Sequence, residues 1–181
     1  FVLAASIFCL GTTEFMIAGL LPTIAGDLGV SIPSAGLLIS GFAIGMAVGT
    51  PLMTAATLRL PRRATLLASL LAFVLGHVLA ALATTYGALM TARIITAVAC
   101  GTFWAAAAVV SVALAPAGAR AKALAVLLGG LTVSNVVGVP LGALVGQQLG
   151  WRAAFWAVAV LASVSAVGVA MVVPRGGRGA A

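Results

Sequence analysis

Six long apolar stretches, separated by short polar or basic segments, constrain this chain more than any other feature. A helix needs about 20 apolar residues to cross the hydrocarbon core of a bilayer. Inside lipid the backbone must satisfy its own hydrogen bonds, so each stretch is expected to be helical. The expected spans are 1–25, 33–58, 64–83, 87–114, 123–149 and 153–173. We therefore predict an all-α membrane protein with six transmembrane helices.

Composition supports lipid as the solvent of this chain. The sequence is 64% hydrophobic and 6% charged, whereas about 25% of the residues in a soluble domain are charged. The basic residues are not interleaved with exposed aromatics, so nucleic acid is not an expected partner. One histidine and two isolated cysteines provide neither a nucleophile–base set nor metal ligands. We predict that the protein is not an enzyme and holds no cofactor and no metal.

The basic residues predict the orientation of the chain. Of the nine, seven follow the second, fourth and sixth spans and therefore share one side of the membrane: Arg59, Arg62, Arg63, Arg120, Lys122, Arg175 and Arg178. Arg152 alone lies on the opposite side. Positive loops stay in the cytoplasm, so both ends of the chain are expected there. Residues 1–174 should form one six-helix unit, and 175–181 a basic cytoplasmic tail or linker.

The chain has only two acidic residues, Glu14 and Asp27, and Glu14 lies inside the first span. A carboxylate at the bilayer centre costs a few kcal/mol, so it usually faces a bundle interior or a water-filled path. There Glu14 could hold a proton or pair with a cation. The alternative is a structural carboxylate, hydrogen-bonded to a neighbouring helix, that never titrates.

Arg93 is the second charge inside the spans. A rise of about 1.5 Å per residue places Glu14 ~18 Å and Arg93 ~9 Å below the outer surface. An inward-pointing arginine side chain could narrow that gap and form a direct or water-bridged pair. In the alternative, Arg93 extends to the outer interface. If the pair forms, Glu14 and Arg93 are the candidate residues for proton coupling.

Four further side chains inside the spans are candidate ligand-binding residues. His77 could relay protons or be a hydrogen-bonded packing residue. Asn135 could bind a ligand or another helix. Phe103 and Trp104 could line an aromatic cavity wall, or face lipid and neighbouring helices.

Two glycine ladders mark close helix packing. Their members are spaced by four residues and share one helix face: Gly41, Gly45 and Gly49 in the second span, and Gly138, Gly142 and Gly146 in the fifth. Such a face lets a neighbouring backbone approach closely. Pro140 lies within the second ladder and should kink its helix or free a carbonyl. Each ladder is on the middle helix of a group of three, which is typical of a 3 + 3 bundle built from inverted repeats.

Four motifs together resemble the N-terminal half of the major facilitator superfamily, and within it the twelve-span drug:proton antiporters. They are GTTEFMIAGLLPTIAGDLGVS, the loop LRLPRR with Arg59, Arg62 and Arg63, LMTARIITAVACG with Arg93, and GVPLGALVGQQLGWRAAFW. The likeness covers nearly all of the chain and is strongest to the chloramphenicol-resistance exporters of actinobacteria. Leu58 and Pro61 depart from the usual loop pattern, which commonly has an acidic residue and a glycine there.

The resemblance implies proton-driven efflux, by antiport, of a small amphiphilic drug, with chloramphenicol-type antibiotics as the sharpest expectation. Glu14 would take a proton in the outward-facing state and release it inside. The implied location is a bacterial inner membrane. The implied partners are the bilayer, protons, the drug, and a missing C-terminal half or a second copy. Two alternatives are an arabinose-type sugar exporter of the same superfamily and a non-transporting membrane assembly subunit.

Overall fold

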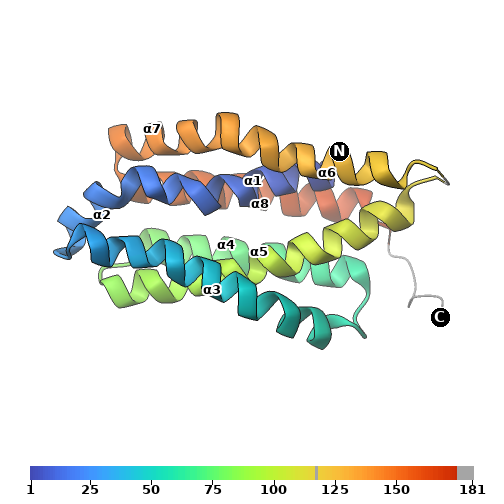
Figure 1. Cartoon of the computed structure of the whole chain (residues 1–181), viewed down its shortest axis with the longest axis horizontal. Coiled ribbons are helices and arrows are strands. Elements are labelled where there is room, and N and C mark those ends of the chain that lie inside the picture. Colours follow the sequence, from blue (N-terminus) through green and yellow to red (C-terminus); the bar gives the residue numbers. More distant parts are fainter. Residues whose placement is uncertain (117, 175–181) are drawn as a thin grey trace.

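The computed structural model describes residues 1–116 and 118–174, and these residues form helices and connecting turns without a strand (Figure 1). The predicted tail, 175–181, with Arg175 and Arg178, lies outside the described residues. In chain order the elements are α1 (Val2–Met16), the 3-10 segment η1 (Ile17–Leu20), α2 (Leu21–Leu28), α3 (Ile32–Thr57), α4 (Arg62–Leu82), α5 (Tyr86–Leu114), α6 (Arg120–Val133), the π-helical segment η2 (Ser134–Gly138), α7 (Val139–Leu149) and α8 (Trp151–Val172).

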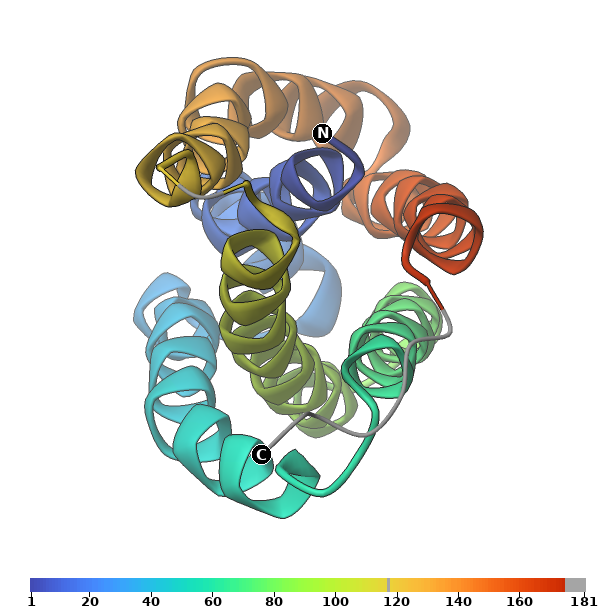
Figure 2. The same cartoon turned by 90° about the vertical axis from the view of Figure 1, so that its right-hand side faces the viewer.

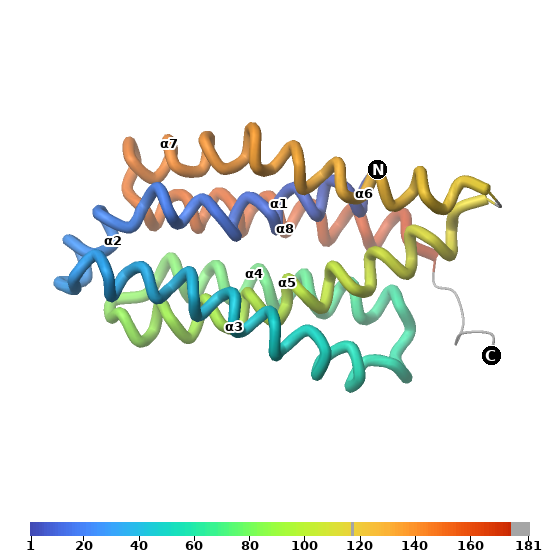
Figure 3. The backbone as a smooth tube through the Cα atoms, in the orientation of Figure 1, coloured from blue at the N-terminus to red at the C-terminus, as the bar shows by residue number. Residues whose placement is uncertain are grey.

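These elements make six helices that are long and apolar enough to cross a membrane. The first span joins α1, η1 and α2, and the fifth joins α6, η2 and α7. Figure 3 shows the spans running side by side along the long axis. The prediction of six helices is confirmed, with ends within a few residues of those expected.

The packing repeats between the two halves of the bundle. Span one contacts spans five and six, through α6, η2, α7 and α8. Span four, α5, contacts spans two and three, α3 and α4. Spans three and six contact each other (Figure 2). Exchanging the first three spans with the last three leaves this pattern unchanged, which confirms the predicted 3 + 3 bundle.

Each glycine ladder faces a helix of the other three-span group. In span two the facing pairs are Gly41 with Met90, Gly45 with Ala97 and Gly49 with Val98. In span five they are Gly138 with Thr12, Gly142 with Met16 and Gly146 with Leu20. The two ladders therefore do the same structural work in the two repeats, one against span four and the other against span one.

One end of the bundle is fastened by Asp27 at the end of α2. Its carboxylate accepts hydrogen bonds from Trp151 Nε1 at 3.0 Å and from the Arg152 guanidinium. Arg152 also donates to the carbonyl oxygen of Ala83 at 2.9 Å. Spans one, three and six are thus joined where they leave the membrane. Because Asp27 and Arg152 are both well exposed, this ion pair contributes little to stability.

At Gly130 the backbones of α6 and α1 lie so close together that a larger side chain should destabilise the bundle. A Cβ at this position would collide with the backbone carbonyl of Ala4 on α1, whereas the neighbouring Gly129 has open space around it. Gly130→Val should destabilise the bundle by about 1–3 kcal/mol, because two backbones must separate. Gly129→Val is the matched control and should behave like wild type. Thermal unfolding in detergent measures the difference, and equal midpoints for the two variants would contradict the prediction.

Candidate functional site

Glu14 lies in the last turn of α1 and lines a cavity of about 550 Å³ between spans one and two. Its side chain is half-buried. The other lining residues are Phe15, Ile39, Phe42, Ala43, Met46, Ala47, Thr50 and Pro51. Glu14 is the single charged group on this wall in the part of the chain that the structure describes. The carboxyl group is therefore neither sealed in the core nor surrounded by other polar groups.

Arg93 is fully buried on α5 and does not extend to the membrane interface. One terminal nitrogen, Nη1, donates a hydrogen bond to the carbonyl oxygen of Thr13 at 3.2 Å. The guanidinium carbon lies 4.2 Å from the centre of the Phe42 ring, a cation–π geometry. Within residues 1–116 and 118–174, the Nε and Nη2 atoms of Arg93 have no hydrogen-bond partner. The cation is thus held by one carbonyl and one ring.

Arg93 contacts the residue that precedes Glu14, because the Arg93 guanidinium donates its hydrogen bond to the backbone of Thr13. Among the described residues, however, the ion pair is formed by Arg152 and Asp27, and none joins Glu14 to Arg93. Their roles in proton coupling stay predictions.

His77 on α4 is fully buried behind Thr13. Its Nδ1 lies 2.9 Å from the carbonyl oxygen of Phe73, which can only accept, so Nδ1 donates. The Nε2 atom of a neutral ring then accepts from the Thr13 hydroxyl, at 2.5 Å. The ring also packs on Phe73 and Phe155, with centroid distances of 4.2 and 5.8 Å. A chain of hydrogen bonds therefore links spans four, one and three.

The three remaining candidates for ligand binding, Phe103, Trp104 and Asn135, do not line the Glu14 cavity. Phe103 is fully buried in the core, and Trp104 is half-buried against it. Asn135 is exposed on η2. The structure does not bring these three together with Glu14, and their substrate contacts stay predictions.

Sequence reasoning did not single out Phe42 and Thr13, which contact Arg93. Phe42 is the one aromatic residue of span two and directly follows Gly41 of the first ladder. That position, one aromatic ring beside a close helix contact, is the signal that could have identified it. Thr13 gave no signal, because the bond to Arg93 uses its backbone carbonyl.

The π-helical segment η2 lies against α1 just before Glu14. Pro140 follows it and has no N–H for a helical hydrogen bond, so the helix needs a local adjustment here. A Cβ at Gly138 would collide with Thr12 Oγ1, and one at Gly11 would collide with Ser134 Oγ. Such π segments often mark functional positions. The irregular turns of spans one and five, η1 and η2, thus flank the Glu14 region.

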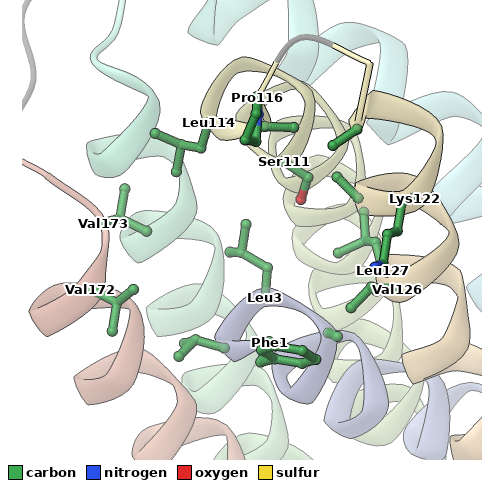
Figure 4. A pocket seen from close by; sticks show the side chains of 15 residues that line it. Phe1, Leu3, Ser111, Leu114, Pro116, Lys122, Val126, Leu127, Val172 and Val173 are labelled. Atoms are coloured by element: carbon green, nitrogen blue, oxygen red, sulfur yellow. The ribbon is translucent and has the colours of Figure 1, made fainter.

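A second hollow of about 460 Å³ opens at the end of the bundle where α1 begins (Figure 4). It lies between the starts of α1 and α6 and the ends of α5 and α8. Its walls are apolar apart from Ser111 and Lys122 in the described part of the chain. None of the site residues predicted from the sequence lines it.

Similarity to known proteins supports this description. A family model described as Major Facilitator Superfamily matches residues 3–180. The chain is 48% identical over 176 residues to a chloramphenicol resistance protein of Streptomyces lividans, covering 97% of this chain and 45% of the relative. It is 43% identical over 178 residues to the inner membrane transport protein YdhP of Escherichia coli K12, covering 98% of this chain and 46% of that protein.

Two solved structures share the fold at low sequence identity. The proton:xylose symporter XylE, bound to 6-bromo-6-deoxy-D-glucose, superimposes with a TM-score of 0.82 at 18% identity, over 94% of this chain and 43% of that one. A peptide transporter POT in complex with sulfate gives 0.83 at 13% identity, over 94% and 36%. This chain spans less than half the length of these relatives.

Six apolar helices in a repeated 3 + 3 arrangement, a mid-span acid on a cavity and a family match over nearly the whole length lead to one conclusion. The chain belongs to the major facilitator superfamily and corresponds to an N-terminal half of its transporters.

Proposed function

We propose that this chain serves proton-coupled export of a small amphiphilic compound, with chloramphenicol-type antibiotics as the first candidates. The observation that carries the proposal is the half-buried carboxyl group of Glu14 on an otherwise apolar cavity. The similarity to a chloramphenicol resistance protein supports the choice of substrate.

The site can couple a proton to a ligand through simple electrostatics. Removal from water favours the neutral carboxylic acid, and a nearby cation favours the carboxylate. A compound that enters the cavity displaces water from Glu14, and the nearby cation is Arg93, which is bound to the carbonyl oxygen of the preceding residue. Proton and substrate then compete for the same carboxyl group, which is the requirement for antiport.

The cavity suits an amphiphile better than a sugar. Its volume of about 550 Å³ is within the usual range for small-molecule sites. A sugar needs several hydrogen-bonding partners, and leaving its hydroxyl groups unpaired is costly. Besides Glu14, the described wall offers the Thr50 side chain, whose hydroxyl is buried against Gly101. This observation favours drug export over the arabinose-type alternative.

We assign His77 a packing role rather than proton relay. Both ring nitrogens are engaged, one with Thr13 and one with Phe73, and the ring does not line the Glu14 cavity. Its function is then to hold span three against span one, which fixes the turn that carries Glu14.

Replacement of Glu14 by Gln tests the proposed function. Gln keeps the size of the side chain but cannot release a proton, so Glu14→Gln should reduce proton-driven chloramphenicol export to the level of cells that lack the protein. Asp27→Asn is the matched control. It removes the second carboxylate of the chain, which lies outside the cavity, and it should retain export. Drug accumulation in everted vesicles with an imposed pH gradient, compared with vesicles from cells that lack the protein, measures both. Undiminished export by Glu14→Gln would remove this residue from the mechanism.

A double-mutant cycle tests the packing role of His77. Thr13→Val and His77→Leu should each destabilise the protein by about 1–3 kcal/mol, because each leaves a buried polar partner unpaired. The double variant should lose less than the sum, since the two residues share one interaction. Thermal unfolding in detergent gives the three values.

Transport by the same His77→Leu variant separates packing from proton relay. We expect export to keep its dependence on the pH gradient in vesicles matched for folded protein. Loss of that dependence, with folding intact, would contradict the packing role.

A further inference from the structure

Phe42 on α3 contacts Arg93 and also lines the cavity of Glu14, so it belongs to the surroundings of both charged groups of the site. One side of its ring carries the Arg93 guanidinium, with 4.2 Å between the guanidinium carbon and the ring centre. The same residue is part of the wall of the cavity that Glu14 lines. Phe42 is 2% exposed and belongs to the buried core, so its ring is held in place by packing.

Arg93 is under-satisfied in this arrangement. The Nε and Nη2 atoms of its guanidinium are buried, and neither has a hydrogen-bond partner among the described residues. Unpaired buried donors are costly, and a ring face replaces only part of the lost interaction with water. The guanidinium therefore gains stability if it can move toward an acceptor.

Glu14 is the acceptor that fits. A carboxylate can accept two N–H groups of a guanidinium at once. Glu14 directly follows Thr13, to whose carbonyl oxygen Arg93 is already anchored. The other titratable groups that face this region are His77 on α4 and Cys100 on α5. The membrane parts of α3, η2 and α7 have none in their sequences, and Arg152 on α8 is bound to Asp27.

We propose that Phe42 is a positioning residue that holds Arg93 away from Glu14. With the ring in place, Glu14 keeps its proton in the apolar cavity. When the ring moves, Arg93 swings on its Thr13 anchor, pairs with the carboxylate and displaces the proton. This inference rests on the proposed function and names the side chain that times proton release.

Carbodiimide labelling of Glu14 tests the inference without requiring transport. The reagent reacts with protonated carboxyl groups in apolar sites, so labelling across a pH series, read by mass spectrometry, gives the pH at which Glu14 is half-protonated. The transporter is labelled in native membranes, and Glu14→Gln gives the background. Chloramphenicol export by the wild type is measured separately.

Removal of the ring should lower the midpoint. In Phe42→Leu and in Phe42→Met the guanidinium loses its ring face and approaches Glu14, which stabilises the carboxylate. The midpoint should therefore fall by about one pH unit. Phe42→Tyr keeps the ring and should match the wild type. Phe103→Leu, the same change at a buried core position away from Arg93 contacts, should also match it.

Two results would overturn the inference. One is an unshifted midpoint in both Phe42→Leu and Phe42→Met, each shown to be folded. The other is an equal shift in Phe42→Tyr or Phe103→Leu, which would indicate a general packing effect. Failure of the proposed function has a different signature, because wild-type vesicles would then fail to export the drug whatever the labelling midpoints are.

Discussion

Close contact between helix backbones at glycine positions is the constraint on which this bundle depends. Lipid tails are as apolar as leucine, so burial of apolar side chains gives little force for helix association in a membrane. Packing contacts must supply it. The ladders of spans two and five bring these helices against spans four and one, and Gly130 brings α6 against the backbone of Ala4. Each of these contacts involves span one or span four, which carry Glu14 and Arg93.

This close packing makes possible the unusual burial of Arg93. Burying a cation with two nitrogens that lack hydrogen-bond partners among the described residues is costly, so the surrounding helices must supply compensation. Here the compensation comes from the carbonyl oxygen of Thr13 and the ring of Phe42. The Thr13 hydroxyl is itself bound to His77, so three spans position the guanidinium. The cavity next to it leaves Glu14 partly accessible, which gives the two charges different surroundings although they are close.

The candidate site was predictable in part. An acid and an arginine inside apolar spans stand out in any sequence, so Glu14 and Arg93 were identified before their surroundings were known. Their partners were not. Thr13 acts through a backbone carbonyl that every residue has, and Phe42 is one apolar residue among many in span two. Asn135, Phe103 and Trp104 were candidates on residue type alone, and the structure places them away from the Glu14 cavity.

The sequence by itself determined the number of spans, their helical character and the likeness to one superfamily. These follow from local properties: stretch length against bilayer thickness, and the need of a backbone in lipid to bond with itself. Only the tertiary structure decided which helices touch, that both ladders face equivalent partners, and that Phe42 contacts Arg93 and also lines the Glu14 cavity. Such relations depend on how each helix is rotated about its axis and on its depth relative to neighbours. Apolar residues lie on every face of these helices, so the hydrophobic pattern of the sequence does not determine that rotation.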